Sequence, residues 1–383
     1  MKRGHHFDLL QILGRFQWED YCRDWNKVLI EKGLPYSSPD NNLPIALYFF
    51  ASACVDPFIP ELTTTSERLT VEALITNDPG PYKVILSLSE PYSSPDNNLP
   101  IETAQVSVKD QNGALFSFKH DNRGVYYSDS ASFNAKTGHI YTLIIRWNGK
   151  EYQSSPELLK EAPGIDSAYT RYVEKTLLNG ITRGEFEVYL STKDPVGKGD
   201  FYKWDHAHLN KTDFCAFTYD GEARVRYRFP CCSPCWNVVK KRGVIDISAD
   251  TYFDGNTVNR VITSIPYDDD TPYFMVFDQY AISKNTYTFW KSVRTQVNNT
   301  GGIFDNPPAT IPSNIYNTKD TTELVLGVFS AAGHKSRGFY LKRNTAPTNP
   351  YRSTPTEYKD ERVCRPCEES FKMTAKKPLG WID

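Results

Sequence analysis

The stretch Leu69–Gly80, LTVEALITNDPG, sets the pattern of the chain. Apolar and polar residues alternate from Leu69 to Ile75, which predicts a strand with one buried face. The run ends in Asn77–Gly80, where Pro and Gly favour a turn. Similar short segments follow at 82–88, 104–108, 114–118, 125–127, 139–147 and 151–152. Short strands with turn signals between them predict an immunoglobulin-like β-sandwich over residues 69–163.

A second, larger domain is expected over residues 164–343. Strand-like segments recur there at 184–190, 200–209, 223–229, 245–248, 258–265, 273–282, 324–329 and 338–342. A single helix is predicted over 283–298, with Ser283 as N-cap and an apolar stripe formed by Tyr287, Trp290, Val293 and Val297. The chain is therefore expected to be mainly all-β: the sandwich, then an antiparallel β-barrel or sandwich with one packed helix. Residues 344–383 form a Cys-containing C-terminal tail.

Upstream of the strands lies Ile45–Cys54, IALYFFASAC. A short apolar run that ends in small residues directly before Cys is typical of a bacterial lipobox, which predicts cleavage and lipidation at Cys54. The alternative is a buried strand or helix segment that happens to end in Cys. On the first interpretation residues 1–53 are a leader, Cys54 carries a lipid, and residues 54–68 are a Pro/Thr-rich tether.

The start of the leader is anomalous. The segment PYSSPDNNLPI occurs letter for letter at residues 35–45 and again at 91–101. True repeat arrays contain three or more units, so a lone perfect copy indicates a recent duplication or a misassembled start. We expect residues 1–44 to lie outside the functional fold.

The composition excludes some partners. The chain has 383 residues, of which 23% are charged, and a net charge of −2. Nucleic acid is not an expected partner, since binding to phosphates needs a basic surface. No apolar run approaches the roughly 18–20 residues of a spanning helix, so the sequence predicts no segment that crosses a bilayer.

The cysteines carry the clearest chemistry. The chain has eight. Apart from Cys22 and Cys54, six remain: Cys215, Cys231, Cys232, Cys235, Cys364 and Cys367. Two Cys-x-x-Cys pairs, 232/235 and 364/367, allow a four-thiolate zinc site or redox-active thiols. An exported location favours disulfides that clip the tail onto residues 231–235, although the pairing is open.

Metal ligation is a weaker hypothesis at two places. His206 and His208 flank one residue of a predicted strand, so their rings share a face and could bridge a metal. Asp268–Asp270 could offer oxygen ligands to calcium but lacks the spacing of an EF-hand. A plain exposed strand face and a solvated turn are the alternatives, and we expect neither metal nor cofactor.

Ligand binding is a further hypothesis. Arg224, Arg226 and Arg228 alternate along one predicted strand and could hold an anion, or could simply protect a sheet edge. Trp204 and Trp236 could stack on a sugar, although most aromatic residues of a strand-rich chain belong to its core. No nucleophile elbow, phosphate-binding loop, dinucleotide fingerprint or zinc-protease motif is present.

Several distinctive blocks resemble one known family: 54–58 (CVDPF), 71–82 (VEALITNDPGPY), 201–204 (FYKW), 231–236 (CCSPCW), 283–290 (SKNTYTFW), 301–309 (GGIFDNPPA), 326–329 (LGVF) and 378–381 (PLGW). Together they resemble the Bacteroidota lipoproteins of the domain-of-unknown-function 4249 family, over about residues 54–383. This resemblance implies a lipoprotein of the outer membrane, periplasmic or surface-facing, that commonly accompanies a TonB-dependent transporter. The first 44 residues depart from the family.

The expected function follows from the lipid tether, from the first domain as a spacer and from the second domain, which is rich in aromatic residues. We expect a non-enzymatic accessory lipoprotein that helps a TonB-dependent transporter to capture or admit its substrate. A stand-alone surface module that binds glycan or peptide is the first alternative. A hydrolase or redox enzyme is the second, and it requires carboxylates or thiols that converge in a pocket.

Overall fold

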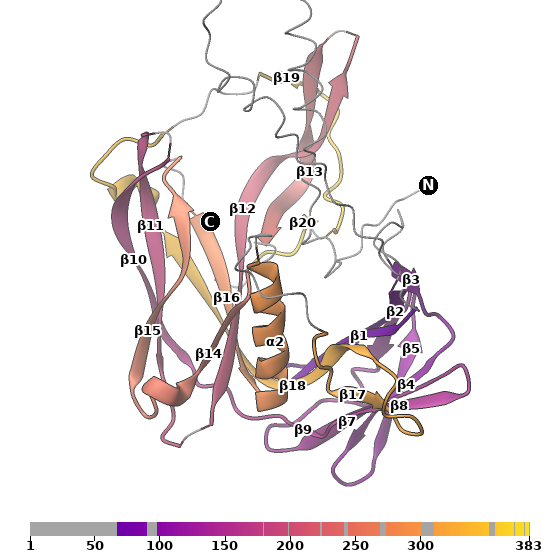
Figure 1. Cartoon of the computed structure of the whole chain (residues 1–383). Helices are drawn as coiled ribbons and strands as arrows, with labels where there is room; N and C mark the ends of the chain where they lie inside the picture. The colour runs from indigo at the N-terminus through magenta and orange to yellow at the C-terminus, as the bar shows by residue number, and fades with distance from the viewer. Residues whose placement is uncertain are drawn as a thin grey trace, which may run out of the picture. The chain divides into compact units, whose positions relative to one another are not determined.

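The computed structural model describes residues 67–89, 98–178, 180–197, 199–222, 224–240, 244–268, 273–299, 310–351, 357–370, 372–378 and 380–382. They belong, with the exception of Glu67, to one compact unit, Arg68–Ser89 with Asn98–Asp383. The predicted leader, Cys54 and the tether up to Ser66 lie outside the described residues. The described part consists mainly of strands, which confirms the all-β prediction (Figure 1). Its helices include none with the length and apolar character that a membrane span needs.

The first body is the predicted β-sandwich. In β1 (Leu69–Thr76) the residues Leu69, Val71, Ala73 and Ile75 are buried, as their alternation with polar residues predicted. β1 pairs with β2, β2 with β3 and β6, β6 with β5, β5 with β4, and β4 with β7. The remaining strands are β2 (Lys83–Ser89), β3 (Asn98–Pro100), β4 (Gln105–Asp110), β5 (Leu115–His120), β6 (Val125–Ser128), β7 (Ile140–Trp147), β8 (Lys150–Ser154) and β9 (Glu157–Leu158).

Two segments from far along the chain complete this sandwich. β17 (Ile315–Asn317) pairs with β8, and the first half of β18 (Leu326–Leu341) lies parallel to β1. Phe329 of β18 enters the core. Gly327 has φ +93° and approaches β1 so closely that a Cβ atom would lie 1.8 Å from the Val71 carbonyl oxygen. The sandwich thus extends beyond the range 69–163 expected from the sequence.

The second body has two layers of sheet. β10 (Ile165–Thr176), β11 (Thr182–Lys193) and β15 (Thr257–Pro266) form a three-stranded antiparallel sheet. Its apolar face packs on a second layer, and the shared core contains Phe186 and Val188 from one side with Trp204, Met275 and Phe277 from the other. The second layer consists of β12 (Phe201–Asp220), β13 (Val225–Lys240), β14 (Asp246–Ala249), β16 (Tyr273–Ile282) and the end of β18. No pairing among the described strands joins the two layers, so the sequence's barrel alternative is wrong and the sandwich alternative holds.

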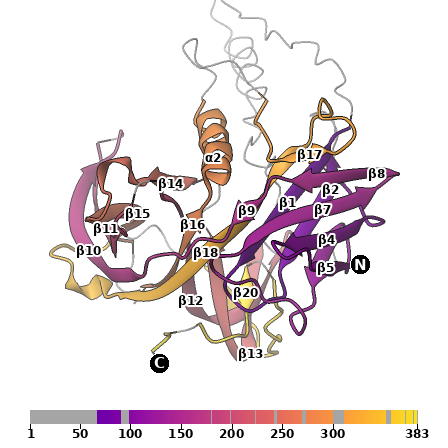
Figure 2. The same ribbon diagram turned by 90° about the horizontal axis from the view of Figure 1, so that it is seen from below.

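β18 is shared by both bodies. Its first half pairs with β1, and from Gly333 to Leu341 it pairs antiparallel with β16. Figure 2 shows this strand running without a break from the sandwich into the second body. A Cβ atom at Gly333 would lie 2.1 Å from the carbonyl oxygen of Lys160, so the linker between the bodies crosses β18 in contact.

α2 (Lys284–Val297) begins where the sequence predicted. The Ser283 Oγ accepts a hydrogen bond from the Thr286 N–H at 3.1 Å and caps the helix. The buried residues of the helix are Thr286, Phe289 and Val293. Of the predicted stripe, Val293 is buried and Trp290 and Val297 are partly buried against the same cluster, whereas Phe289, which the stripe did not include, lies at its centre.

Candidate functional site

The hairpin formed by β12 and β13 is longer than the sheet to which it belongs. β16 pairs with β12 only from Phe201 to Leu209, whereas β13 follows β12 as far as Asp220. Figure 1 shows the two strands extending past the end of β16. A two-stranded hairpin is marginally stable in water, so this extension needs further stabilisation.

Three disulfides supply that stabilisation. Cys215–Cys231 joins the two strands of the hairpin next to places where the register shifts, between Thr212 and Ala216. Cys232–Cys364 and Cys235–Cys367 link β13 to the C-terminal tail. All six cysteines that the sequence singled out are therefore bonded in pairs. The sulfur atoms of Cys215, Cys235 and Cys367 lie within 4.8 Å of one another, but as disulfides they are not the free thiolates that the zinc hypothesis required.

The tail runs along the outer edge of β13. β19 (Lys359–Asp360) pairs parallel with Tyr227 and Arg228, and β20 (Met373–Thr374) pairs antiparallel with Trp236 and Asn237. Between them, the Cys232 N–H donates a hydrogen bond to the Arg365 carbonyl oxygen at 2.9 Å. Covalent bonds and a strand edge thus hold the tail on the hairpin.

Trp236 anchors the end of the tail rather than a ligand. It is only 4% exposed, and its ring meets Trp381 edge to face with 6.1 Å between centroids. The ring centroids of Phe274 and Tyr340 each lie 5.6 Å from that of Trp381. The Ile382 N–H donates to the Tyr340 hydroxyl at 2.6 Å. The hypothesis that Trp236 stacks on a sugar is wrong, since its faces are packed inside the protein.

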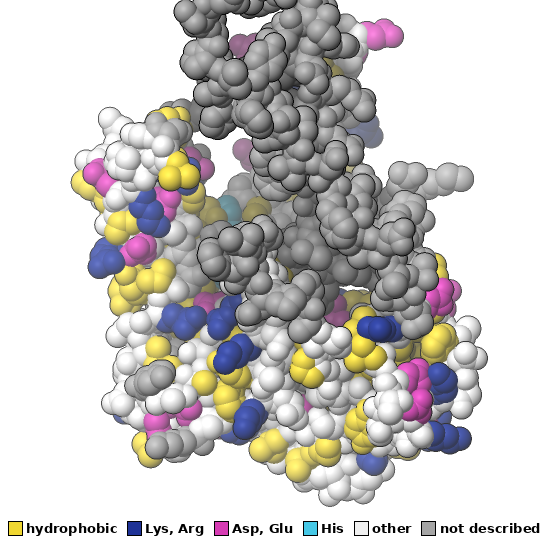
Figure 3. All heavy atoms as spheres, viewed as in Figure 1, with side chains coloured by type: hydrophobic (Ala, Val, Ile, Leu, Met, Phe, Trp, Pro, Cys, Tyr) yellow, Lys and Arg dark blue, Asp and Glu magenta, His cyan; other side chains and the backbone are white. Residues whose placement is uncertain are grey.

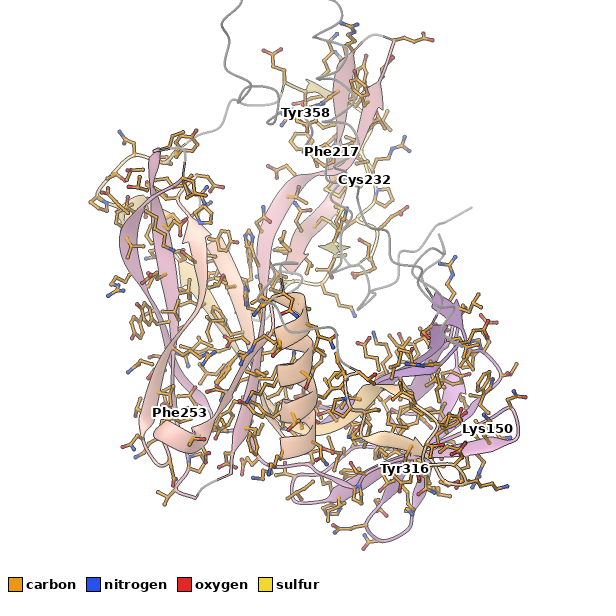
Figure 4. All side chains as sticks on the ribbon, viewed as in Figure 1. Lys150, Phe217, Cys232, Phe253, Tyr316 and Tyr358 are labelled. Carbon is orange, nitrogen blue, oxygen red and sulfur yellow. A yellow bond between two sulfur atoms is a disulfide. The ribbon has the colours of Figure 1, made fainter. Side chains whose placement is uncertain are left out.

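The outer half of the hairpin carries exposed aromatic residues next to arginines. Phe217 is 57% exposed and stands opposite Arg228, and Tyr219 is 62% exposed and stands opposite Arg226. Tyr358, from the tail, meets Phe217 edge to face at 5.7 Å. Figure 4 shows Phe217 and Tyr358 near one another on the hairpin above Cys232. We call these five side chains, Phe217, Tyr219, Arg226, Arg228 and Tyr358, the hairpin face.

Arg228 holds the tail against the hairpin face. Its guanidinium lies 4.0 Å from the Phe214 ring centroid and forms a bidentate ion pair with Asp360. This ion pair raises the pKa of Arg228 and lowers the pKa of Asp360. Arg224 does not join the row that the sequence predicted, because it lies in the turn before β13 with φ 53°.

The other candidates on β12 face the interior. The Trp204 Nε1 donates to Gln279 Oε1 at 2.8 Å in the core, so this residue is not a ligand platform either. His206 and His208 share one face of β12, as predicted, and both are partly buried there rather than lying on an exposed strand face. His208 stacks on Tyr273 with 3.3 Å between centroids, and burial, with a smaller effect of the Arg343 charge, lowers its pKa to about 4. Neither histidine belongs to a group of three possible metal ligands among the described residues.

The acidic turn at Asp268 is a solvated turn in the described part. Asp268 is exposed and its carboxylate accepts a hydrogen bond from Arg343 at 2.8 Å. Asp269 and Asp270 lie outside the described residues.

A histidine cluster that the sequence did not single out joins the two bodies. His334 Nε2 lies 3.0 Å from Asp278 Oδ1, Nδ1 contacts Asp78, and the ring stacks on Tyr280 at 4.8 Å. The His334 N–H also donates to Asn77 Oδ1 at 2.5 Å. Burial opposes the charged ring, but the Asp278 and Asp78 carboxylates outweigh it and raise the pKa. With both ring nitrogens bound to carboxylates, the cluster acts as an ion-pair link and not as a base for a nucleophile.

Sequence analysis also did not predict a cluster of three aspartates. Carboxylate oxygens of Asp194, Asp200 and Asp250 lie within 4.8 Å of one another. Lys160 forms an ion pair with Asp200 at 2.8 Å, and the Tyr202 hydroxyl donates to Asp194 at 2.5 Å. The Asp250 carboxylate accepts from the backbone N–H of Gly199 at 2.8 Å. Protein donors thus satisfy this cluster, whose members are too far apart in the sequence to form a recognisable motif.

Comparison with known proteins agrees with the resemblance drawn from the sequence. The family model described as "Domain of unknown function (DUF4249)" matches residues 55–337. The matched range covers the first body, the whole β12–β13 hairpin and the second body as far as Arg337 of β18, and it ends before the tail. None of the curated proteins matches the chain.

Proposed function

We propose, from the premise that this chain belongs to the DUF4249 family, that it is a non-enzymatic lipoprotein of the outer membrane. It is tethered through a lipid on Cys54 and helps a TonB-dependent transporter to capture or admit its substrate. The observation that carries the proposal is the hairpin with three disulfides, which extends a stiff, side-chain-rich surface beyond the sheet.

The disulfides support an address outside the cytoplasm. Such bonds form and persist in oxidising compartments such as the bacterial periplasm and the cell surface. Two of them close loops between residues 132 positions apart, and all six cysteines of the described part take part. Export agrees with the lipobox at Ala51–Cys54, which lies outside the described residues.

The chemistry of the described clusters supports binding rather than catalysis. The His334 ring holds two carboxylates, and Asp194 and Asp250 accept hydrogen bonds from the protein itself. Such arrangements fix segments relative to one another. The hairpin face, by contrast, presents aromatic rings and arginine to the outside, the residue types that are enriched at protein interfaces.

Co-purification from outer membranes tests the proposal. The full chain is tagged after Asp383, extracted with mild detergent and purified, and bound proteins are identified. We expect the chain in the membrane fraction with one transporter in a stable ratio, and a Cys54→Ala variant that no longer sediments with membranes. A wild-type chain that stays in the soluble fraction and retains no partner would overturn the proposal.

One observation favours the stand-alone module as second candidate. Tyr169 and Tyr189 stack at 5.1 Å on the outer side of the three-stranded sheet, where Tyr169 is 42% exposed and Arg171 lies over Tyr189. Figure 3 shows acidic, basic and apolar side chains interspersed over this sheet. Retention of the purified chain on a glycan array, lost in Tyr169→Ala and accompanied by no membrane partner, would support this candidate.

A further inference from the structure

We propose that the hairpin face is the surface through which this protein docks on a folded protein partner, with Phe217 as the anchor and Arg226 as the charged contact. The inference rests on the proposed function and names the surface that performs it. The partner presents an apolar socket beside a carboxylate.

Two of the aromatic residues of the hairpin face lie on the part of the hairpin that extends past β16. Phe217 and Tyr219 alternate on β12 beyond its last pairing with β16, where β13 is the one described strand that pairs with it. Both are more than half exposed, so they leave apolar surface in contact with water that a partner would bury. Tyr358 extends the same surface from the tail. Aromatic residues grouped in this way beside arginine are typical of the small set that dominates binding energy at interfaces.

The hairpin face is held rigidly by a disulfide and an ion pair. The Cys215–Cys231 disulfide closes the hairpin two residues before Phe217. β19 pairs with β13 at Tyr227 and Arg228, and the Arg228–Asp360 ion pair links these two strands. A surface held in its binding geometry before contact loses little conformational entropy on association. The disulfide and the added strand therefore serve a surface that must keep its shape while exposed.

The two arginines of the hairpin face indicate the chemistry of the partner. Asp360 neutralises Arg228, whereas no carboxylate among the described residues forms an ion pair with Arg226. The face thus offers one positive charge without an ion pair among the described residues, opposite the exposed ring of Tyr219. A partner surface that matches it supplies a carboxylate to Arg226 and an apolar socket to Phe217.

The charges at the end of the hairpin favour a protein partner over a membrane surface. The turn at the end of the hairpin carries two acidic residues, Asp220 and Glu222, against one basic residue, Arg224, so the part that would first reach an anionic lipid surface has a net negative charge. Like charges repel there, and tip insertion between headgroups is disfavoured. The side of the hairpin, rather than its tip, is the binding surface.

Site-specific photo-crosslinking of the full chain in living cells tests the inference. A photoreactive phenylalanine analogue replaces Phe217 in one strain and Tyr316 in another. Tyr316 is 40% exposed on β17 of the sandwich and serves as the matched control. We expect an adduct from position 217 with the protein that co-purifies with the wild-type chain, and none from position 316. Phe217→Ser and Arg226→Glu should each reduce the co-purified partner about tenfold or more, whereas Tyr316→Ser should not.

Each other outcome has a defined meaning. If wild type retains its partner while Phe217→Ser and Arg226→Glu retain it equally, or if both positions give the same adduct, the inference is wrong and the proposed function stands. An adduct from position 217 with lipid alone also overturns it in favour of a membrane contact. If the wild-type chain retains no partner, the proposed function itself has failed. Oxidation of all six hairpin and tail cysteines in each variant, measured by intact mass, shows that the hairpin has folded.

Discussion

Removal of the two tail disulfides, singly and together, should show an energetic coupling that the topology dictates. The bonds Cys232–Cys364 and Cys235–Cys367 join the same two short segments, each with a sequence separation of 132 residues. Whichever bond remains still closes the long loop. The second bond closes only the small ring formed by residues 232–235 and 364–367.

The magnitudes follow from loop closure. In the chain-entropy treatment a closed loop of 132 residues destabilises the unfolded chain by about 5 kcal/mol, and a ring of eight residues by about 2–3 kcal/mol. Replacing either cysteine pair by alanine should therefore cost about 2–3 kcal/mol, and replacing both pairs should cost about 7 kcal/mol. The double change exceeds the sum of the single changes by roughly 2 kcal/mol.

Urea unfolding followed by tryptophan fluorescence measures these changes, since Trp236 and Trp381 report on the clipped region. Two outcomes would refute the reasoning. One is a double variant that loses no more than the sum of the single variants. The other is a single variant that loses as much as the double variant, because the remaining bond would then not be holding the long loop closed.

Three further changes have defined expectations. Gly327→Ala should destabilise by more than about 3 kcal/mol, because a Cβ atom would overlap the Val71 carbonyl oxygen, whereas Gly113→Ala, at a similar φ of +87° with no atom within 4 Å, should cost only about 1–2 kcal/mol in thermal unfolding. Trp381→Ala removes the aromatic contacts of the tail and should cost about 2–4 kcal/mol and speed proteolysis after residue 370. Glu157→Gln should flatten the pH dependence of stability. Burial raises the pKa of Glu157, so its contribution is fully present below the unfolded pKa of about 4.5 and is lost as the pH rises through the folded pKa.

These three expectations can each be contradicted. Equal losses in the two glycine variants would mean that backbone strain, not contact with β1, sets the cost at Gly327. A Trp381→Ala tail that resists protease as well as wild type would show that the disulfides alone hold it. A Glu157→Gln protein whose stability still declines as in wild type when the pH rises above about 4.5 would assign that decline to other groups.

Local patterns in the sequence predicted much of the fold. The alternation in Leu69–Ile75 determined which side of β1 is buried, and Ser283 marked the start of α2 through its side-chain cap. Both features depend on neighbours within a few residues. The six cysteines could likewise be singled out from their spacing and the expected compartment.

Contacts between distant segments were out of reach of the same reasoning. The parallel pairing of β1 with β18 joins Thr70 to Leu326, and nothing in either segment names its partner. The same holds for Asp78 and Asp278 around His334, which come from different bodies. The buried face of α2 also depends on which sheet it meets. The arrangement of the candidate site therefore depends on tertiary packing, whereas local patterns predicted only some of its residues.

The most direct test of the account is the intact mass of the native protein after extraction from membranes. We expect a chain that begins at Cys54, carries a covalent lipid, and is lighter by six hydrogens than its reduced form, as three disulfides require. A water-soluble chain that retains residue 1, carries no acyl group and has all eight of its cysteines as free thiols would contradict the anchor, the compartment and the clipped hairpin together.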